Sequence, residues 1–517
     1  MNVAAKLIQI LEENHVEHIF GLPGEQILPF YNELANSKIK HILVRHEQSA
    51  AHAADAYRRS SNKLGVCMAT ASSGALNLVM GVATAFKDHV PILVITGDNP
   101  TTNKYSDEFQ SFPLSDVFSK ITFRSYDPQT GSEAIANLIE IMQIFQREPN
   151  GPIHLNLSKN ILLEDDYKIP QVNYEPIYHY GDIEKAYQKI KNSKKPLLIL
   201  GSGARDSKIE KLAIENNIPT CTTFPAKGII SEYEKNSLGL IGNRSNNQGK
   251  YALKHSDCVI AVGTRLSERT LKEDISDKLI HVNIDKNVLK GDLAIHMDCK
   301  VFAEELEFPN ALNFLEEILN INPEDEVDEI NDKSQPLRPP SVINSILKSS
   351  KDAIIVSDAG SHTTWTTLLT KCSFPGQLLF SGGLAPMGYG LPAAIGASIA
   401  TDKSTVLING DGDIQMNIHE LATLKEYDLA VCVCILNNSS YYAIKQTQKN
   451  LYNEEPFEVD LNNPDFIKIA EAYSIPAKKV TSKEDLEETV NEAINLRKPY
   501  LIEIIVKEED IPLTKLQ

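Results

Sequence analysis

Short apolar runs separated by helix-length segments recur along the whole chain. The predicted strands are Val16–Phe20, His41–Val44, Gly65–Ala69, Pro91–Thr96 and Ile153–Leu157 in the first third, Pro196–Leu200 in the middle, and Ala353–Ser357, Thr405–Asn409, Ala430–Leu436 and Tyr500–Val506 in the last third. Runs that are apolar on both faces are typical of parallel strands, because the connecting helices cover such a sheet on both sides. The pattern therefore predicts an α/β fold built on parallel sheets.

Two polar stretches divide this alternation into three parts. The first, 163–182, is acidic and carries Pro and Tyr, and the second, 321–340, is rich in Asp, Glu, Asn and Pro and lacks hydrophobic periodicity. A chain of 517 residues is also too long for a single core. The sequence predicts three doubly wound parallel-sheet domains, which are an N-terminal domain at 1–165, a central domain at 183–320 and a C-terminal domain at 340–517.

The net charge argues against several classes of partner. Lys and Arg number 51 against 69 Asp and Glu, which gives a net charge of −18. Most of such a surface would repel nucleic acid and anionic membranes. The N-terminus lacks the features of a signal peptide, and no apolar run approaches the ~20 residues that span a bilayer. We therefore expect a cytoplasmic protein whose seven scattered cysteines are buried and reduced.

The strongest chemical signal lies in the predicted C-terminal domain. The strand Thr405–Asn409 runs directly into Gly410-Asp411-Gly412, and after one predicted helix Ala430–Leu436 runs into Asn437-Asn438. Ligands of open parallel sheets gather at the carboxyl ends of the strands, so the carboxylate and the amide would meet there. Hard oxygen ligands in small number suit Mg²⁺ that also binds phosphate. Each motif alone is a common turn or helix cap, but their joint placement is much more specific.

The spacing of these two motifs resembles the signature of thiamine diphosphate-dependent enzymes. The resemblance implies that Asp411, Asn438 and the backbone carbonyl of Ser440 bind Mg²⁺, which would bridge the two phosphates of the cofactor. It also implies that Gly412 and Asp413 lie beside the cofactor.

A second part of the resemblance is Arg45-His46-Glu47-Gln48, between the strand His41–Val44 and an Ala-rich predicted helix. By residue chemistry alone, Glu47 is a helix-start carboxylate in a favourable dipole. The resemblance implies instead that Glu47 hydrogen-bonds the aminopyrimidine ring of the cofactor and promotes its activation. The family places the cofactor between the first domain of one chain and the third of another. A homodimer or homotetramer is therefore implied.

Two more segments match the family. Met387, within Ser381–Pro392, falls where a bulky apolar residue supports the bent cofactor. The segment Asp358–His362 resembles the loop that approaches the diphosphate through Gly360 and His362, with Ser361 in place of a more usual polar residue.

The order of motifs is similar to that of the acetolactate synthase large-subunit branch of the family. These motifs are Phe20–Gly24, Phe109-Gln110, Gly151–His154, Lys227-Gly228 and Gly263–Arg269. The resemblance implies that Gln110 lies near the bound intermediate and Arg269 near the substrate entrance. It further implies a carboligase that decarboxylates pyruvate or a similar 2-oxo acid and joins the remaining fragment to a second 2-oxo acid. A regulatory subunit is a further partner that the resemblance allows.

Departures from the branch keep other activities open. Glu25 stands where the branch usually has Gly and decarboxylases of the family carry an acid, and Thr447 stands where the branch has Trp. A non-oxidative decarboxylase that releases an aldehyde, with Glu25 as the proton donor, is the alternative hypothesis. A third is a non-catalytic nucleotide-binding homologue, against which the presence of Glu47, Asp411 and Asn438 argues.

FAD is left open by the sequence. Gly201–Ala204 follows a predicted strand and is compatible with the close approach of a nucleotide, but so short a glycine pair is weak evidence. Gly239–Asn243 departs in its second half from the flavin-contacting pattern of the branch. If FAD binds, we expect a structural rather than a redox role.

Overall fold

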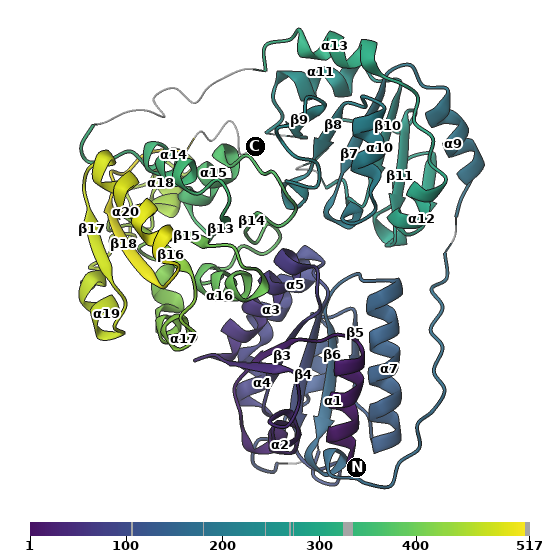
Figure 1. Ribbon diagram of the computed structural model, residues 1–517, viewed down its shortest axis with the longest axis vertical. Coiled ribbons are helices and arrows are strands. Elements are labelled where there is room, and N and C mark those ends of the chain that lie inside the picture. The colour runs from purple at the N-terminus through teal and green to yellow at the C-terminus, as the bar shows by residue number, and fades with distance from the viewer. Residues whose placement is uncertain are drawn as a thin grey trace. The chain divides into compact units, whose positions relative to one another are not determined.

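The computed structural model describes residues 1–104, 107–178, 180–242, 244–267, 270–271, 273–323 and 334–511. The chain forms two compact units. One comprises Met1–Pro176, Asn331–Leu368 and Leu379–Glu509, and the other comprises Ile177–Ile330, Leu369–Leu378 and Asp510–Gln517. Three six-stranded sheets, each flanked by helices, confirm the predicted α/β class (Figure 1). The exact domain boundaries stay a prediction, and residues 324–333 of the second predicted connector lie outside the described residues.

The N-terminal sheet has the strand order β2-β1-β3-β4-β6-β5, and all neighbouring strands are parallel. Its strands are β1 His18–Gly21, β2 Lys40–Leu43, β3 Gly65–Ala69, β4 Ile92–Asp98, β5 Arg124–Tyr126 and β6 Ile153–Ser158. Its helices are α1 Val3–Glu13, α2 Leu28–Leu34, α3 Glu47–Ser61, α4 Ser73–Asn77, α5 Val79–Asp88, α6 Leu114–Phe118, α7 Gly131–Arg147 and α8 Lys159–Leu162. Separate apolar cores beneath α1, α2, α7 and α8 and beneath α3 to α6 show that helices cover both faces.

The central sheet has the order β12-β11-β10-β7-β8-β9, again with parallel neighbours. Its strands are β7 Pro196–Leu200, β8 Thr220–Thr222, β9 Ser237–Leu240, β10 Cys258–Val262, β11 Leu279–Asn283 and β12 Leu293–His296. Its helices are α9 Ile183–Lys191, α10 Ile209–Glu215, α11 Asn247–His255, α12 Cys299–Glu304 and α13 Leu312–Leu319. Cores on both faces hold the helices in place, and Tyr187 of α9 stacks on Phe302 of α12 with ring centroids 5.2 Å apart.

The C-terminal sheet has the order β14-β13-β15-β16-β18-β17. Its strands are β13 Ile354–Ser357, β14 Leu378–Leu379, β15 Thr405–Gly410, β16 Val431–Asn437, β17 Ala477–Val480 and β18 Tyr500–Ile505. Its helices are α14 Pro339–Ser349, α15 Ser361–Leu369, α16 Gly390–Ala400, α17 Leu421–Glu426, α18 Tyr442–Asn450, α19 Phe466–Ala472 and α20 Lys483–Leu496. Arg338, which precedes α14, donates through Nε to Glu509 at 2.8 Å and so ties the start of this domain to its end.

The N-terminal and C-terminal sheets share one compact unit because α3 packs closely on α16. A Cβ atom at Gly396 of α16 would lie 2.0 Å from the carbonyl oxygen of Ala53 on α3, so only glycine allows this approach. Buried charges reinforce the same joint. The Arg59 guanidinium lies 2.8 Å from carboxylate oxygens of both Asp55 and Asp88, and the Tyr389 hydroxyl donates to Asp55 at 2.9 Å.

The predicted strands all exist, with ends shifted by at most two residues, and β3 and β7 coincide with their predictions. Between β3 and β4 the chain forms two helices, α4 and α5, with Leu78 between them. The prediction misses most of the central sheet and the edge strands β5, β14 and β17. Such strands are short or carry polar residues, so their hydrophobic signal is weak.

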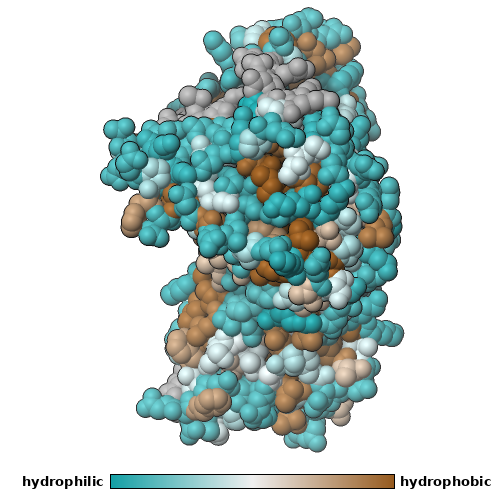
Figure 2. All heavy atoms as spheres, turned by 90° about the vertical axis from the view of Figure 1, so that its left-hand side faces the viewer, coloured by the Kyte–Doolittle hydropathy of each residue, from teal (hydrophilic) through white to brown (hydrophobic). Residues whose placement is uncertain are grey.

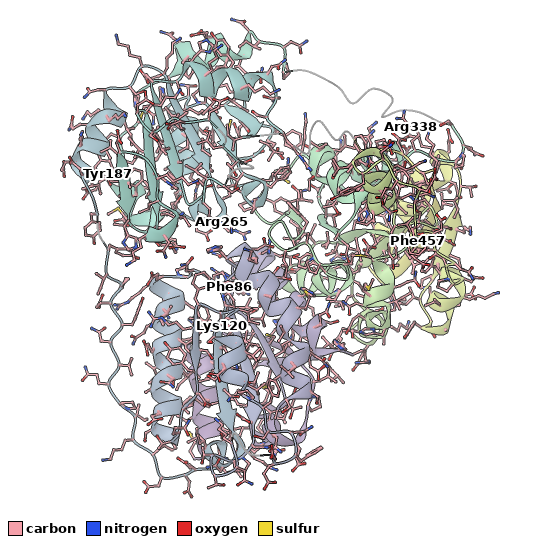
Figure 3. The ribbon with its side chains drawn as sticks, turned by 180° about the vertical axis from the view of Figure 1, so that it is seen from behind. Phe86, Lys120, Tyr187, Arg265, Arg338 and Phe457 are labelled. Atoms are coloured by element: carbon pink, nitrogen blue, oxygen red, sulfur yellow. The ribbon has the colours of Figure 1, made fainter. Side chains whose placement is uncertain are left out.

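The structure bears on the expectations about the cysteines and about the surface of the protein. All seven cysteines are buried and free, as predicted. Within the described residues no helix is long and apolar enough to cross a membrane. Hydrophilic side chains cover most of the face shown in Figure 2, which agrees with the high net charge, and the stick view in Figure 3 shows how densely side chains fill each domain.

We predict that Gly396→Ala destabilises the protein. The added methyl group would meet the Ala53 carbonyl oxygen of α3, and overpacking of this kind costs about 1–3 kcal/mol. Thermal denaturation should show a lower melting temperature. Gly382→Ala is the matched control, because its Cβ would lie 3.5 Å or more from other atoms, and it should melt like the wild type. Equal melting temperatures for both variants would contradict the role given to this contact.

Candidate cofactor site

The two polar motifs of the C-terminal domain meet at the carboxyl edge of its sheet, as predicted. Strands β15 and β16 are parallel neighbours, with Gly410 paired to Leu436. The backbone N–H of Asp411 donates to the Leu436 carbonyl at 3.2 Å, and a Cβ at Gly412 would lie 2.3 Å from the Tyr441 ring. The Gly-Asp-Gly loop therefore packs directly on the loop that carries Asn438.

Asp411 is buried and held by a partner that the sequence did not reveal. Its Oδ2 accepts from Asn463 Nδ2 at 2.6 Å, and the same amide group donates to Asn437 Oδ1 at 3.1 Å. Burial raises the pKa of Asp411, while hydrogen bonds from Asn463 and from the backbone of Ser439 and Ser440 oppose this increase. Hydrogen bonds from Asn463, Ser439 and Ser440 thus orient the Asp411 carboxylate.

The other two predicted metal ligands flank this carboxylate. Asn438 is half-buried, and its side chain makes no hydrogen bond within the described part of the chain. Ser440 is buried, and its Oγ has no hydrogen-bond partner among the residues that the structure describes. No three His, Cys, Asp or Glu side chains gather into a metal cluster among the described residues. The predicted set contains only one such side chain, so that finding does not conflict with it.

Asp358, at the end of β13, organises the loop that carries Met387. Its carboxylate accepts from the backbone N–H of Gly388 at 3.0 and 3.1 Å and of Gly390 at 2.7 Å. Burial raises the pKa of Asp358 to about 6, although these N–H groups lower it. Gly388 has φ +93°, and a Cβ there would lie 2.7 Å from Met416, so glycine is required at this turn. Met387 itself is half-buried beside this fixed turn.

His362 and Asp413, two predicted cofactor-binding residues, lie together on the same edge. His362 Nε2 is 3.3 Å from Asp413 Oδ2, without hydrogen-bond geometry for either atom. Burial lowers the pKa of His362 to about 4, so the ring is neutral near pH 7. Burial and the nearby Asp358 raise the pKa of Asp413. Gly360 packs against this imidazole, since its Cβ would lie 2.7 Å from the ring.

Five buried polar atoms at this edge have no hydrogen-bond partner among the described residues. They are Ser361 Oγ, His362 Nε2, Asn409 Oδ1, Asp413 Oδ2 and Ser440 Oγ. Buried polar groups in proteins are almost always hydrogen-bonded, and an exception calls for an explanation such as a ligand or ion. This mixed set of donors and acceptors therefore fits a polar cofactor group such as a diphosphate with its metal.

Glu47, the first residue of α3, lies in a second polar cluster at the carboxyl edge of the N-terminal sheet. Its Oε2 accepts from Asn77 Nδ2 at 2.9 Å, and a Cβ at Gly74 would lie 3.1 Å from its Oε1. Gly74 and Asn77 belong to the segment 72–77, which also contacts Gln110, because Ser72 Oγ donates to the Gln110 carbonyl. The structure therefore connects Glu47 and Gln110 through one short segment of chain.

A buried ion-pair network anchors the loop that carries Gln110. The Lys104 side chain is 3% exposed, and its Nζ lies 3.4 Å from Asp98 Oδ2 and also pairs with Asp127. Asn156 Nδ2 donates to Asp98 at 2.7 Å and to Asp127 at 3.0 Å. Farther along, Asn99 Nδ2 donates to the Phe109 carbonyl at 2.9 Å. The backbone at Gln110 has φ +58°. Ser72 holds the carbonyl of Gln110, and Asn99 holds the carbonyl of the preceding residue.

Glu25 does not join these clusters in the described structure. The Glu25 side chain is 67% exposed and pairs with Lys159 at 3.1 Å. Arg269 and Asn243 lie outside the described residues. In the central domain, a Cβ at Gly201 would lie 2.1 Å from the Gly263 carbonyl oxygen. Packing between two strand ends thus accounts for this glycine, and it gives no support to FAD binding.

Comparisons with known proteins agree with this geometry. Family models for the N-terminal TPP-binding, central and C-terminal TPP-binding domains of thiamine pyrophosphate enzymes match residues 1–117, 183–306 and 358–504. A probable acetolactate synthase large subunit of Methanococcus aeolicus is 35% identical, with 98% of this chain and 92% of the relative covered. The acetolactate synthase large subunit of Cyanidium caldarium is 36% identical, with 97% and 93% covered.

The chain belongs to the thiamine pyrophosphate enzyme family. Its relatives place it in the acetolactate synthase large-subunit branch, and the predicted resemblance is confirmed. As a member of this family it is a thiamine diphosphate-dependent enzyme. The non-catalytic hypothesis is therefore wrong.

Several residues of this family member escape prediction because they come from distant segments. Asn463 hydrogen-bonds Asp411, and no local motif marks it. Asn77 hydrogen-bonds Glu47 from a segment 30 residues farther along the chain. Asp358 stands in a segment that the sequence singled out for Gly360 and His362, and its position after a buried strand was the available signal.

We predict that Lys104→Met leaves the buried Asp98 and the half-buried Asp127 without this cation and lowers the free energy of unfolding by about 3–5 kcal/mol at pH 7. Loss of the ammonium raises the folded-state pKa of Asp98 further above its unfolded value. The folded protein then takes up the proton first, and the deficit shrinks as the pH falls. Urea denaturation at pH 7 and pH 5 measures both effects.

Lys445→Met is the control for this variant. Lys445 pairs with Asp460 and Glu508, whose side chains are 78% and 38% exposed, so its loss should cost less than about 1 kcal/mol. A Lys104→Met deficit as small as that of Lys445→Met, or one that does not change with pH, would contradict the assignment.

Proposed function

We propose that this chain is a thiamine diphosphate- and Mg²⁺-dependent carboligase that decarboxylates pyruvate or a similar 2-oxo acid and joins the remaining fragment to a second 2-oxo acid, as acetolactate synthases do. The observation that carries the proposal is the similarity to acetolactate synthase large subunits over nearly the whole chain. The two polar clusters around Asp411 and Glu47 support it independently, because they supply the groups that such a cofactor requires.

In this proposal the residues divide into two groups. Thiamine diphosphate, when bound, supplies the nucleophilic carbon and the electron sink for decarboxylation. Glu47 would hydrogen-bond the aminopyrimidine, and Gln110 would contact the substrate-derived group. Met387 would support the bent cofactor, while the diphosphate would contact the following residues: Gly360, Ser361, His362, Gly412 and Asp413.

The metal would be Mg²⁺, bound by the Asp411 carboxylate, the Asn438 amide oxygen and the Ser440 carbonyl oxygen. Three hard oxygen ligands leave positions for phosphate oxygens and water, as Mg²⁺ prefers. The fixed orientation of Asp411 by Asn463 and the lack of hydrogen bonds at Asn438 support this assignment.

We further propose a homodimer or homotetramer in the cytoplasm. The names of the relatives, which are large subunits, support a regulatory subunit as a partner. FAD binding stays a prediction, and the packing of Gly201 does not support it. Aldehyde release with Glu25 as proton donor is the less favoured reaction, because the relatives are synthases and Glu25 is paired with Lys159.

The test is incubation of the purified full chain with pyruvate, thiamine diphosphate and Mg²⁺, with and without FAD. We expect CO₂ and acetolactate, detected as acetoin after acid treatment. Glu47→Gln should lower the rate by about 10²- to 10⁴-fold. Glu13→Gln, at an exposed position of α1, should leave the rate unchanged. CO₂ with free acetaldehyde as the main product would favour the decarboxylase instead.

Asp411→Ala should abolish binding of thiamine diphosphate in the presence of Mg²⁺, since it removes the one carboxylate of the proposed metal site. Titration calorimetry measures the affinity, and circular dichroism verifies that the variant is folded. Asp402→Ala, in an exposed turn, should bind the cofactor like the wild type. An unchanged affinity of folded Asp411→Ala for thiamine diphosphate would contradict the metal assignment.

A further inference from the structure

The turn between β2 and α3 is held by side chains of the C-terminal domain. Glu420 Oε1 accepts from the backbone N–H of Arg45 at 2.9 Å and of His46 at 3.2 Å. Tyr427 Oη accepts from the backbone N–H of Leu43 at 2.8 Å. These contacts join two sheets of the same compact unit, and they end at the residue before Glu47.

Glu420 is suited to hold this turn firmly. Its side chain is 0% exposed, and Thr423 Oγ1 donates to its Oε2 at 2.5 Å, so both carboxylate oxygens are engaged. Hydrogen bonds from backbone N–H groups to a buried carboxylate are stronger than those to a neutral acceptor. The nearest cationic candidate is His419, whose Nε2 lies 3.6 Å from Oε1, and burial lowers its pKa. The N–H groups of Arg45 and His46 and the Thr423 hydroxyl therefore supply the hydrogen bonds to this buried carboxylate.

The direction of the Glu47 side chain depends on this turn. Glu47 opens α3, and His46 is the N-cap, with its Nδ1 accepting from Gln48 N–H at 3.2 Å. The backbone angles of His46 set where Glu47, the first helical residue, points, and Glu420 accepts from the N–H of His46. Asn77 holds the far end of Glu47 at Oε2. Glu47 is thus constrained both at its backbone and at its carboxylate.

The segment that carries Glu420 also belongs to the proposed cofactor site. Glu420 N–H donates to the Asn417 carbonyl at 3.0 Å, and Asn417 Nδ2 donates to the Gly388 carbonyl at 2.7 Å. The stretch from Asp411 to Glu420 therefore contacts the Met387 turn at one place and the Glu47 turn at another.

We propose that Glu420 is a positioning residue, which sets the orientation of Glu47 through the backbone of Arg45 and His46. The inference rests on the proposed role of Glu47 and deepens it. A structural role alone would make Glu420 matter for stability, whereas a positioning role makes it matter for cofactor activation. A displacement of about 1 Å at such a group can cost 10²-fold in rate.

The experiment measures deuterium exchange at the acidic carbon of the thiazolium ring in the holoenzyme with thiamine diphosphate and Mg²⁺. Glu420→Ala should slow this exchange by between about 10- and 100-fold while cofactor affinity stays close to that of the wild type. Glu420→Gln, which keeps an acceptor at Oε1, should recover most of the rate. Glu426→Gln is the matched control, since it removes only the ion pair with the Arg45 side chain and should exchange like the wild type.

A second readout uses the protein without cofactor. Amide hydrogen exchange at Arg45 and His46, followed by mass spectrometry, should be faster in Glu420→Ala and unchanged in Glu426→Gln. If Glu420→Ala does not fold, Glu420→Asp replaces it, because the shorter carboxylate keeps the charge but loses the reach to both N–H groups.

The outcomes separate the two proposals. Exchange at the thiazolium carbon as fast as in the wild type, in a folded Glu420→Ala or Glu420→Asp variant with faster amide exchange, would overturn the positioning role. Wild-type exchange in Glu47→Gln would instead overturn the role of Glu47 itself, and with it the premise of this inference.

Discussion

The close packing of α3 on α16 is the contact on which the rest of the proposed site depends. Gly396 lets the Ala53 carbonyl approach to a distance that no larger residue allows. Glu47 opens one of these helices, and Gly390, which donates to Asp358, opens the other. Because these two helices pack against each other, the N-terminal and C-terminal sheets each present their polar cluster from a shared support.

Buried polar groups lie both in this joint and at the proposed cofactor site. In the joint, the buried charges of Arg59, Asp55 and Asp88 pair with one another, which offsets the cost of their burial. At the carboxyl edge of the C-terminal sheet, five buried polar atoms have no partner. Such atoms cost free energy unless a ligand completes their hydrogen bonds. The five atoms at this edge therefore support the proposal that it binds a polar cofactor.

Two carboxylates are prepared for their proposed tasks in the same way. Asn463 orients Asp411, and Asn77 orients Glu47, in each case with a side-chain amide as the donor. Glu420 adds a third constraint from outside the N-terminal sheet. Preorganised groups of this kind lose little entropy when a ligand binds. These contacts therefore lie at the residues whose orientation matters most for the proposed site.

The sequence by itself determined the α/β class, most strands of the outer sheets, the position of Glu47 at a helix start and the meeting of Asp411 with the Asn438 loop. These follow from local patterns, because apolar runs predict parallel strands and the carboxyl ends of such strands share one edge. Only the tertiary structure decided which distant residues support them. Asn463, Asn77 and Glu420 reach the site from a loop and from helix ends whose positions depend on how the sheets and helices pack, and no spacing along the chain encodes that packing.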